Sequence, residues 1–257
     1  IYPFVWTFIN SLKGSLEYSG GNPFALPKKP LFSNYIDAFE LLELDDGTTF
    51  FDMIFNSVWY TFLASFLGVF MSCVTGYCLS KYEFKARKYI YSVAIFCMTI
   101  PIVGSMGAYY KLIGELGLYD TPMYVVVTNL SSWGFNFLVM YGFFKNVSWT
   151  YAEAAQIDGA GHFRIYFTIM IPMAVPVLVS LGILSAIGYW NDYFTVYMYM
   201  PEKATIAYGL QRISDQNKNN LPQVFAAVIF SMIPVLVIFS IFQKTIMNNT
   251  TIGGIKG

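Results

Sequence analysis

The sequence predicts an all-α membrane protein, a six-span polytopic helical bundle, and two observations lead to this prediction. Of the 257 residues, 56% are hydrophobic and only 12% are charged, whereas soluble domains carry about 25% charged residues. The chain also contains long windows without a charged residue, and each exceeds the roughly 20 residues that a helix needs to cross a membrane. These windows are Met53–Ser80, Tyr89–Tyr110, Thr121–Phe144, Ile165–Asn191 and Asn219–Gln243.

The windows are expected to be helical because lipid offers the backbone no hydrogen-bond partners. Every backbone N–H and C=O must then be satisfied within its own segment, which an α-helix achieves. The apolar segment Ile1–Asn10 is interpreted as a sixth span, truncated at the N-terminus, whose helix begins upstream. The whole chain, residues 1–257, is therefore expected to form a single transmembrane domain in contact with membrane lipid.

Small residues recur along the window Met53–Ser80, where they predict a face that packs closely against other helices. They are Ser57, Gly68, Ser72, Gly76 and Ser80. The next window contains Pro101, Gly104 and Gly107. These residues predict either a plain kink or a hinge that moves during function, and the sequence leaves both alternatives open.

The charged residues indicate an orientation in the membrane. The short loop Lys81–Lys88 is dense in Lys and Arg, and cytoplasmic loops of membrane proteins are enriched in these residues. The segments predicted to lie in the cytoplasm are therefore Lys81–Lys88, Lys145–Arg164 and Lys244–Gly257. The segments predicted to lie outside are then Lys13–Asp52 and Pro201–Pro222. The second of these is polar and could contact a soluble partner. The formal net charge of +0 gives no indication of nucleic-acid binding.

The cysteines lie inside predicted spans and are interpreted as packed thiols rather than disulfide partners. They are Cys73, Cys78 and Cys97. No spacing of His, Cys or carboxylate residues suggests a metal site, and no cofactor is expected. The single histidine, His162, is expected to be an exposed loop residue.

Polar and aromatic residues are spaced along the fourth predicted span at helical intervals. Asn129, Trp133, Asn136 and Met140 would share one face of a continuous helix. Polar side chains facing lipid are costly, so this face should contact protein or a water-filled path. Two interpretations remain open: hydrogen bonds between helices, or a route for a carbohydrate, whose ring faces and hydroxyls suit Trp and amide groups.

The fifth predicted span ends with Trp190, Asn191, Asp192 and Tyr193. About 20 residues after Pro172, a rise of 1.5 Å per residue places Asp192 about 30 Å along the helix, near the outer membrane boundary. Asp192 is therefore predicted to be interfacial, with Trp190 and Tyr193 in the aromatic belt. Asn191 fits the same boundary or the lining of a pathway.

The chain between the fourth and fifth spans is polar and rich in small residues. Thr150 is predicted to be an N-cap, with Glu153 completing a capping box at the third helical position. Gly159 lacks a Cβ, so it can adopt φ > 0 and end the helix. A second segment is expected to begin at His162, before the fifth span starts at Pro172. A helix–turn–helix of small residues fits a groove on another protein, where backbones approach closely.

The spacing of small and apolar residues in this stretch matches a known signature. Glu153-Ala154-Ala155 is followed after three residues by Gly159 and, after nine more, by Ile169-x-Ile171-Pro172. This pattern resembles the EAA signature of ABC-importer permeases, which usually has Leu at the position of Ile171 and often has Pro at that of Trp149. Other segments resemble the maltose-type carbohydrate permeases of that family: Leu79–Lys85, Gly117–Thr121, Ile157–Ala160, Trp190–Asp192 and Gly254–Gly257.

The resemblance implies a multi-pass permease of the bacterial plasma membrane, with residues 146–172 as a cytoplasmic coupling segment between spans four and five. It implies a heterodimer with a second permease subunit, two cytoplasmic ABC ATPases that bind the EAA helix, and an extracytoplasmic solute-binding protein that delivers a sugar. The residues implied to couple to the ATPases are Glu153, Ala154, Ala155, Asp158, Gly159 and Ala160. The chain has no Gly-rich phosphate loop, so it is expected to be non-catalytic, with ATP hydrolysis belonging to the partner subunits.

The leading hypothesis is the membrane subunit of an ATP-driven importer for an oligosaccharide or sugar derivative. Its candidate pathway residues are Asn129, Trp133, Asn136, Trp190 and Asn191. A non-sugar solute such as a polyamine is the alternative within the same machinery, although a cation route would favour carboxylates in the spans, and only Asp192 approaches that. A self-contained secondary transporter or intramembrane enzyme is disfavoured, because the spans lack paired acids and proton-relay carboxylates.

Overall fold

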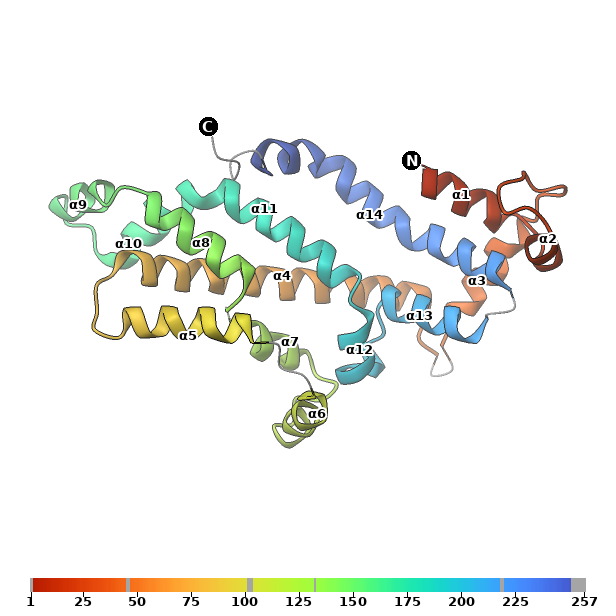
Figure 1. Cartoon of the computed structure of the whole chain (residues 1–257), viewed down its shortest axis with the longest axis horizontal. Helices are drawn as coiled ribbons and strands as arrows, with labels where there is room; N and C mark the ends of the chain where they lie inside the picture. The colour runs from red at the N-terminus through yellow and green to blue at the C-terminus, as the bar shows by residue number, and fades with distance from the viewer. Residues whose placement is uncertain (1, 45–46, 101–103, 132, 218–219, 251–257) are drawn as a thin grey trace. The chain divides into compact units, whose positions relative to one another are not determined.

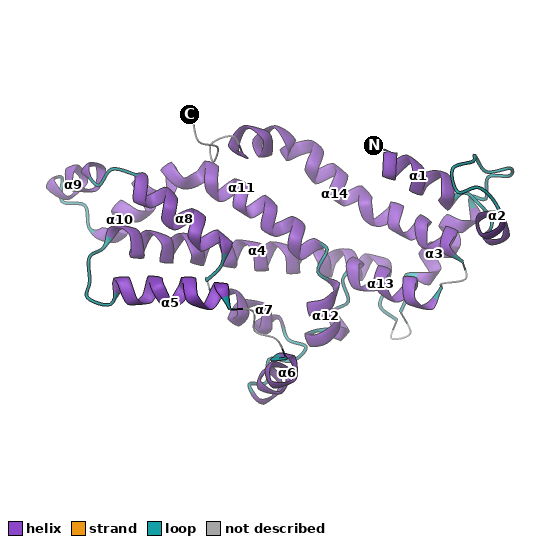
Figure 2. Cartoon of the chain, in the orientation of Figure 1, coloured by secondary structure: helices purple, strands orange, loops and turns teal. Residues whose placement is uncertain are grey.

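The computed structural model describes residues 2–44, 47–100, 104–131, 133–217 and 220–250, and the secondary structure of these residues is helical throughout (Figure 1, Figure 2). The all-α prediction is therefore confirmed for the part of the chain that is described. These residues divide into two compact units. Predicted features outside the described residues are Ile1, Pro101, Asn219 and Gly254–Gly257.

Unit 1 comprises Ile1–Tyr60 and Trp190–Phe242. It includes the first residues of α4 (Phe50–Lys81). Its other elements are α1 (Tyr2–Ser11), α2 (Ser15–Gly20), α3 (Ser33–Leu41), α12 (Tyr193–Tyr199), the 3-10 turn η2 (Pro201–Lys203), α13 (Ile206–Gln216) and most of α14 (Leu221–Thr250). Helix α3 lies within Lys13–Asp52, one of the segments predicted to lie outside.

A buried hydrophobic cluster joins the helices of unit 1. Leu42 follows α3, Met53 lies on α4, Ile206 and Ile213 lie on α13, and Ala227 lies on α14. All five side chains are buried. The cluster therefore fixes α3, α13 and α14 against the beginning of α4.

A buried lysine organises the segment that follows α1. Lys13 is only 1% exposed, and its Nζ donates hydrogen bonds to Asn10 Oδ1 at 2.9 Å and to the carbonyl oxygens of Asn22 at 3.1 Å and Pro23 at 3.2 Å. A buried ammonium is costly unless its protons are hydrogen-bonded, and these three acceptors meet that requirement. Lys13 therefore holds the loop after α2 against the end of α1, a structural role that the sequence did not indicate.

Unit 2 comprises Thr61–Tyr189 and Gln243–Gly257. It includes most of α4. Its other elements are α5 (Arg87–Thr99), α6 (Met106–Glu115), α7 (Pro122–Asn129), α8 (Phe135–Asn146), α9 (Thr150–Ile157), α10 (His162–Ile165), the π-helical turn η1 (Tyr166–Met170) and α11 (Ile171–Trp190). A buried cluster that includes Cys73, Tyr77, Met140, Phe144 and Met170 joins α4, α8 and η1.

The predicted packing face of α4 is confirmed. Ser57, Ser72 and Ser80 are buried, and two glycines on the same helix allow close contacts. A Cβ added at Gly76 would lie 2.9 Å from Met140 Cβ and 2.9 Å from the backbone nitrogen of Tyr141 on α8, and one added at Gly68 would lie 3.5 Å from Asn129 Oδ1 on α7. Only glycine allows the α4 and α8 backbones to approach this closely.

Two of the charge-free windows do not form the continuous spanning helices that were predicted. Tyr89–Tyr110 is divided between α5 and α6, and Thr121–Phe144 is divided between α7 and α8. The backbone explains the breaks, because Gly104 has φ +84, in the left-handed region, and Gly134 is extended at φ 164 and ψ −167. Non-helical backbone at membrane depth must be covered by protein or line a water-filled path.

The fifth window begins earlier than predicted. α10, η1 and α11 form one apolar helix from His162 to Trp190, 29 residues long, so a helix does begin at His162 as predicted, but it continues directly into the span, and Pro172 does not mark the start of the span. Within η1, the Ile171 N–H donates to the Tyr166 carbonyl, five residues back. The π turn has a physical reason: Pro172 has no N–H to donate, and its ring would clash with the carbonyl four residues earlier in a regular α-helix.

Two helices of the described residues have the length and composition to cross a membrane: α4 with 32 residues and His162–Trp190 with 29. Helix α14 has 30 residues and contains Pro234, and its apolar part is Leu221–Val237. The six-span count therefore remains a prediction, because fewer helices than six meet this length criterion in the described ranges.

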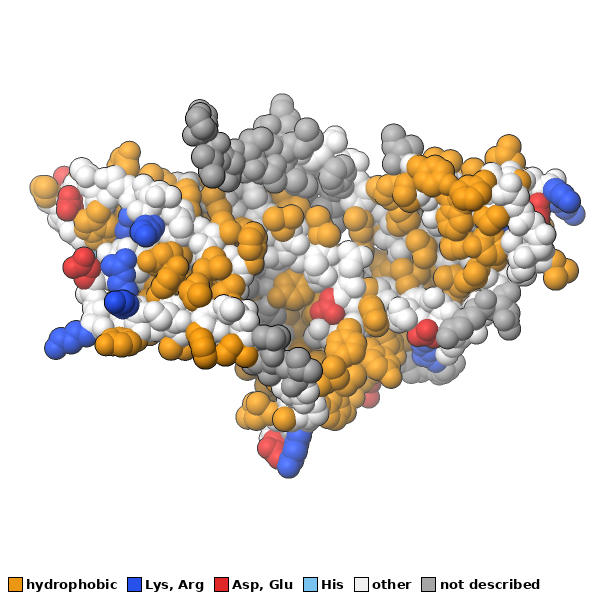
Figure 3. Space-filling view, in the orientation of Figure 1, with side chains coloured by type: hydrophobic (Ala, Val, Ile, Leu, Met, Phe, Trp, Pro, Cys, Tyr) orange, Lys and Arg blue, Asp and Glu red, His pale blue; other side chains and the backbone are white. Residues whose placement is uncertain are grey.

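The surface of both units is unusually apolar. Phe55, Phe62 and Phe66 on α4 are exposed, and the rings of Phe62 and Phe66 stack with centroids 5.9 Å apart. Figure 3 shows hydrophobic side chains over much of the visible face of each unit, with charged side chains near α9, the loop between α4 and α5, and α6. Soluble monomers rarely expose apolar area on this scale, so the surface is suited to lipid and to other membrane subunits.

The cysteines differ in environment. Cys73 is buried and accepts a hydrogen bond from the Tyr166 hydroxyl at 3.4 Å, and Cys78 is partly buried. Cys97 is exposed, and all three thiols are free. The expectation of packed thiols without a disulfide is thus confirmed for Cys73 and Cys78, whereas Cys97 is not packed because its part of α5 lies on the unit surface.

Candidate functional site

Helix α9 and the turn after it form the segment singled out by the sequence. The inner face of α9 is fixed by small residues: Ala152 is fully buried, and Ala155 and Ala160 pack partly buried against the unit 2 cluster. Short side chains let the α9 backbone lie directly on this core. The remaining residues of the segment point outward.

The start of α9 differs from the predicted capping box. Trp149, not Thr150, is the N-cap residue; its backbone is helical, and no side-chain cap is formed. The N–H groups of Ala152 and Glu153 both donate to the Trp149 carbonyl, at 2.8 and 3.1 Å. Tertiary packing explains the difference, because the Trp149 ring packs edge-to-face against Tyr82 with centroids 6.0 Å apart and lies partly buried against the unit 2 cluster.

The end of α9 follows the prediction for Gly159. Its φ is +81, and two backbone bonds close the turn: Gly159 N–H to Gln156 O at 3.0 Å and Ala160 N–H to Ala155 O at 2.9 Å. These bonds define a Schellman motif, with glycine in the left-handed position. The turn is therefore a defined structure and not a loose connection.

The segment is attached to the end of α4. The Tyr82 hydroxyl lies 3.1 Å from His162 Nδ1 within hydrogen-bond distance, and the two rings pack edge-to-face. Lys81 Nζ donates to the carbonyl of Val147, just before α9. His162 is exposed as predicted, but it is the first residue of α10, and its contact with Tyr82 was not foreseen.

The outer face of the segment is exposed and mixed in character. Glu153, Ala154, Asp158 and Gly159 are exposed, so four of the six predicted coupling residues are accessible, and Ala155 and Ala160 belong to the inner face. Two large apolar side chains flank the turn: Ile157 is 87% exposed and Phe163 is 83% exposed. Sequence reasoning missed these two residues, although apolar residues beside a glycine turn in a polar stretch were a usable indication.

The polar residues of the fourth window do not share one helix face, because the chain breaks between α7 and α8. Asn129 and Asn136 nevertheless both bond to α11. The Tyr189 hydroxyl donates to Asn129 Oδ1 at 2.6 Å, and Asn136 Nδ2 donates to Ser185 Oγ at 3.0 Å. Hydrogen bonds between helices, one of the two interpretations of these residues, are therefore present. The role of both residues in a pathway remains a prediction.

The other two residues of that set differ from each other. Trp133 lies in the break and is exposed, and its ring packs edge-to-face on Phe137 with centroids 5.2 Å apart. Met140 is buried in the cluster between α4 and α8. Of the residues predicted to share one helix face, Trp133 offers an accessible aromatic surface, whereas Met140 has a packing role.

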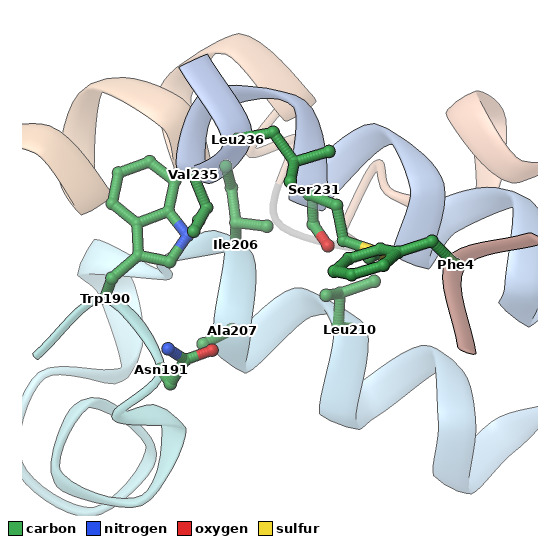
Figure 4. Close-up of a pocket in the computed structure, with 10 residues that line it drawn as sticks. Phe4, Trp190, Asn191, Ile206, Ala207, Leu210, Ser231, Val235 and Leu236 are labelled. Carbon is green, nitrogen blue, oxygen red and sulfur yellow. The ribbon is translucent and has the colours of Figure 1, made fainter. Parts of the chain in front are cut away.

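Trp190 and Asn191 line a cavity of about 190 Å³ in unit 1 (Figure 4). Phe4 of α1, Leu210 of α13 and Ser231 of α14 complete its wall, and Figure 4 shows Trp190 and Phe4 on opposite sides of it. Trp190 is only 8% exposed and belongs to the unit 1 cluster, so its prediction as a belt aromatic was wrong. The cause is the end of α11 at Trp190, which turns the indole inward.

Asp192 has a structural role that its predicted position near the outer membrane boundary did not suggest. It is the N-cap of α12, and its Oδ1 accepts from the Thr195 N–H at 3.0 Å. Its other oxygen accepts from the buried Tyr60 hydroxyl of α4 at 3.0 Å. A carboxylate at a helix N-terminus is stabilised by these bonds and by the helix dipole, so Asp192 orients α12 relative to α4 within unit 1.

The fold and the site define a class of protein: an all-helical membrane protein with an exposed helix–turn–helix whose inner face is packed and whose turn is closed by glycine. The described residues include no group of three His, Cys, Asp or Glu residues that could hold a metal ion.

Comparisons with known proteins identify the family. Residues 65–249 match the family described as binding-protein-dependent transport system inner membrane component, and the chain belongs to this family. It is 29% identical to the melibiose/raffinose/stachyose import permease protein MelC of Bacillus subtilis (strain 168), over 99% of this chain and 91% of that protein. It is also 29% identical to the arabinooligosaccharides transport system permease protein AraQ of the same organism, over 100% of this chain and 91% of that protein.

A solved structure confirms the fold. This chain aligns with a chain of a bacterial ABC transporter involved in the import of the acidic polysaccharide alginate, with a TM-score of 0.76 over 95% of this chain and 89% of that chain. The sequence identity is 24%. The resemblance to importer permeases and the location in the bacterial inner membrane are thereby confirmed.

Proposed function

We propose that this chain is the transmembrane subunit of an ATP-driven ABC importer for an oligosaccharide or sugar derivative. It forms half of the pathway together with a second permease subunit, and an extracytoplasmic solute-binding protein delivers the sugar. Two cytoplasmic ATPases drive transport through α9. The observation that supports this proposal most directly is the α9–α10 segment, which presents an exposed outer face on a rigidly held turn.

The segment has the properties that mechanical coupling requires. A rigid element seated in a partner's cleft transmits a rigid-body motion between two packed states, and the inner face of α9 is fixed through Ala152 and Ala155. On the outer face, the carboxylates of Glu153 and Asp158 are available to Arg or Lys of an ATPase. Ile157, beside them, offers apolar area for the core of the contact.

The names of the relatives support a carbohydrate substrate. Proteins similar over nearly the whole chain are a melibiose/raffinose/stachyose import permease and an arabinooligosaccharides transport permease. The candidate pathway residues have suitable chemistry, since amides and indoles suit sugar hydroxyls and ring faces. They are Asn129, Trp133, Asn136, Trp190 and Asn191.

Charge reversal at Glu153 tests coupling through α9. Glu153 is exposed, and its carboxylate makes no hydrogen bond or ion pair with the rest of the described chain, so Glu153→Lys should leave the fold intact. Like charges at an interface cost several kcal/mol, which predicts at least a tenfold loss of ATPase association, since about 1.4 kcal/mol is tenfold. Co-purification of the ATPases and ATP-dependent sugar uptake in proteoliposomes measure this loss.

The matched control is Glu83→Lys. Glu83 is an exposed acid in the loop after α4, on the side of the membrane predicted to face the cytoplasm, and its reversal changes the net charge by the same amount. Glu83→Lys should keep ATPase association and uptake, and both variants should insert into the membrane normally. Full uptake with Glu153→Lys, or equal losses in both variants, would rule out docking through α9.

A further inference from the structure

Unit 1 contains a second cavity, separate from the one lined by Trp190 and Asn191. It has a volume of about 480 Å³ and lies between α12 and α13, two helices that pack on each other in this unit. Small-molecule sites typically have about 300–1,000 Å³, so the cavity has room for one or two sugar rings. Helix α13 lies in the segment Pro201–Pro222 that is predicted to face outward, and α12 follows the predicted outer end of the fifth span.

Aromatic rings form one wall of this cavity. They belong to Tyr193, Phe194, Tyr197 and Tyr208. The ring centroids of Tyr197 and Tyr208 are 5.9 Å apart, at an interplanar angle of 30°, and Tyr197 is 57% exposed. Rings of this kind offer a flat apolar face together with a phenolic hydroxyl, which matches the combination of C–H faces and hydroxyls on a pyranose.

Planar polar groups of α13 form another part of the wall. Gln211 Nε2 donates to Asp215 Oδ2 at 3.1 Å, and Arg212 lies between them in sequence. Amide, guanidinium and carboxylate groups provide both donors and acceptors in a fixed plane, as neighbouring sugar hydroxyls require. The base and the acid balance each other, so the cavity favours an uncharged ligand over a polyamine or a polyanion.

The start of α13 is held on α4. Ser57 Oγ of α4 accepts from the Ile206 N–H at 2.9 Å, and Asn56 Nδ2 donates to the Ala204 carbonyl at 3.1 Å. Gly209 lies against Met53, where an added Cβ would be 2.6 Å from Met53 Sδ. These contacts place the apolar face of α13 on α4 and leave its polar face toward the cavity.

Helix α12 is held equally firmly by the Asp192 cap and its bond from Tyr60. Both walls of the cavity are therefore positioned by buried contacts before any ligand arrives. Preorganisation of this kind lowers the entropic cost of binding. A cavity formed only by mobile side chains would lack this property.

We propose that the cavity between α12 and α13 binds a pyranose unit of an uncharged oligosaccharide on the outer side of the membrane. The proposal rests on the proposed function as a sugar importer and adds to it a sugar-binding site on this subunit. The site receives the sugar from the solute-binding protein before the sugar reaches the pathway. Tyr197 supplies the ring face and Gln211 supplies hydrogen bonds to hydroxyls.

The test uses the complete importer in nanodiscs, with four uncharged probes that contain pyranose rings: raffinose, stachyose, maltotriose and diacetylchitobiose. Uptake assays first identify which probe the wild-type importer transports. Calorimetric titration of that probe into the importer without the binding protein then measures direct binding. Tyr197→Ala and Gln211→Ala should each weaken binding about tenfold, whereas Tyr197→Phe, which keeps the ring, should bind within about twofold of wild type.

The outcomes separate the two proposals. If the wild type transports none of the four probes, the proposed function as an importer of uncharged sugars fails, and this site fails with it. If a probe is transported but does not bind without the binding protein, or binds equally to wild type and Tyr197→Ala, the site is refuted and the function stands. If Tyr197→Ala leaves sugar binding unchanged but weakens the affinity of the sugar-free solute-binding protein for the importer, this surface is a protein contact and the proposal is overturned.

Discussion

Replacing Gly159 by alanine tests whether the backbone turn after α9 determines the structure of the coupling segment. Gly159 has φ +81, and no atom lies within 4 Å of an added Cβ, so the substitution meets no steric clash. The cost is conformational, because an L-residue in the left-handed region loses about 1–2 kcal/mol. Gly159→Ala should therefore shift the turn toward its open form by about 5–30-fold.

Hydrogen exchange reports this shift directly. The N–H groups of Gly159 and Ala160 close the turn by bonding to Gln156 and Ala155, and their exchange should accelerate by the same 5–30-fold. ATPase association should weaken in parallel if partners bind the closed turn. Gly159→Asn should show a smaller effect on both quantities, since asparagine tolerates the left-handed region better than alanine.

Two other glycines serve as controls. Gly117 ends α6 with φ +65 and the same pair of backbone bonds, and an added Cβ again meets nothing within 4 Å. Gly117→Ala should accelerate exchange at its own turn and leave ATPase association unchanged. Gly161 has φ −75 and ψ 165, which any residue adopts, so Gly161→Ala should change neither quantity. Unchanged exchange in Gly159→Ala, or an equal loss of ATPase association in Gly117→Ala, would refute the reasoning.

Two further predictions concern stability, measured as the melting temperature of the purified chain. Gly76→Ala should lower the free energy of unfolding by about 1–3 kcal/mol, as overpacking does, because the added Cβ meets the α8 backbone. Gly209→Ala should lower it less, because its added Cβ meets the flexible side chain of Met53. The reverse order would contradict this distinction. Tyr189→Phe removes the donor to Asn129 and should cost about 0.6–1.5 kcal/mol; an unchanged melting temperature would show that this bond gives no net stability.

The helical content and the long apolar segments could be predicted from the sequence, because burial in lipid leaves the backbone little choice. A kink or hinge was predicted around Gly104, whereas the break inside Thr121–Phe144 was missed because that window is apolar as a whole. For the window Thr121–Phe144 a local indication existed: Ser131, Ser132 and Gly134 follow one another within four residues, a composition typical of loops. The apolar residues around them outweighed that indication.

The two ends of α9 show which features of the site could be predicted. Gly159 was predicted correctly because a left-handed C-terminal position is a local requirement that glycine alone meets without strain. The N-cap was assigned to Thr150, one residue too late, because Trp149 is held in helical geometry by its packing on Tyr82. A contact between residues so far apart in the chain leaves no trace in the local pattern.

Asp192 shows how a structural requirement can resemble a functional one in sequence. A carboxylate at the end of a charge-free window suggests a pathway residue or a membrane boundary, yet its oxygens are occupied by Thr195 and Tyr60. These bonds lie between the end of α11 and the start of α12, so they determine the positions of the residues beside Asp192. Trp190 is turned into the unit 1 core and Asn191 into a cavity. A role for Asn191 in transport would therefore depend on the Asp192 cap.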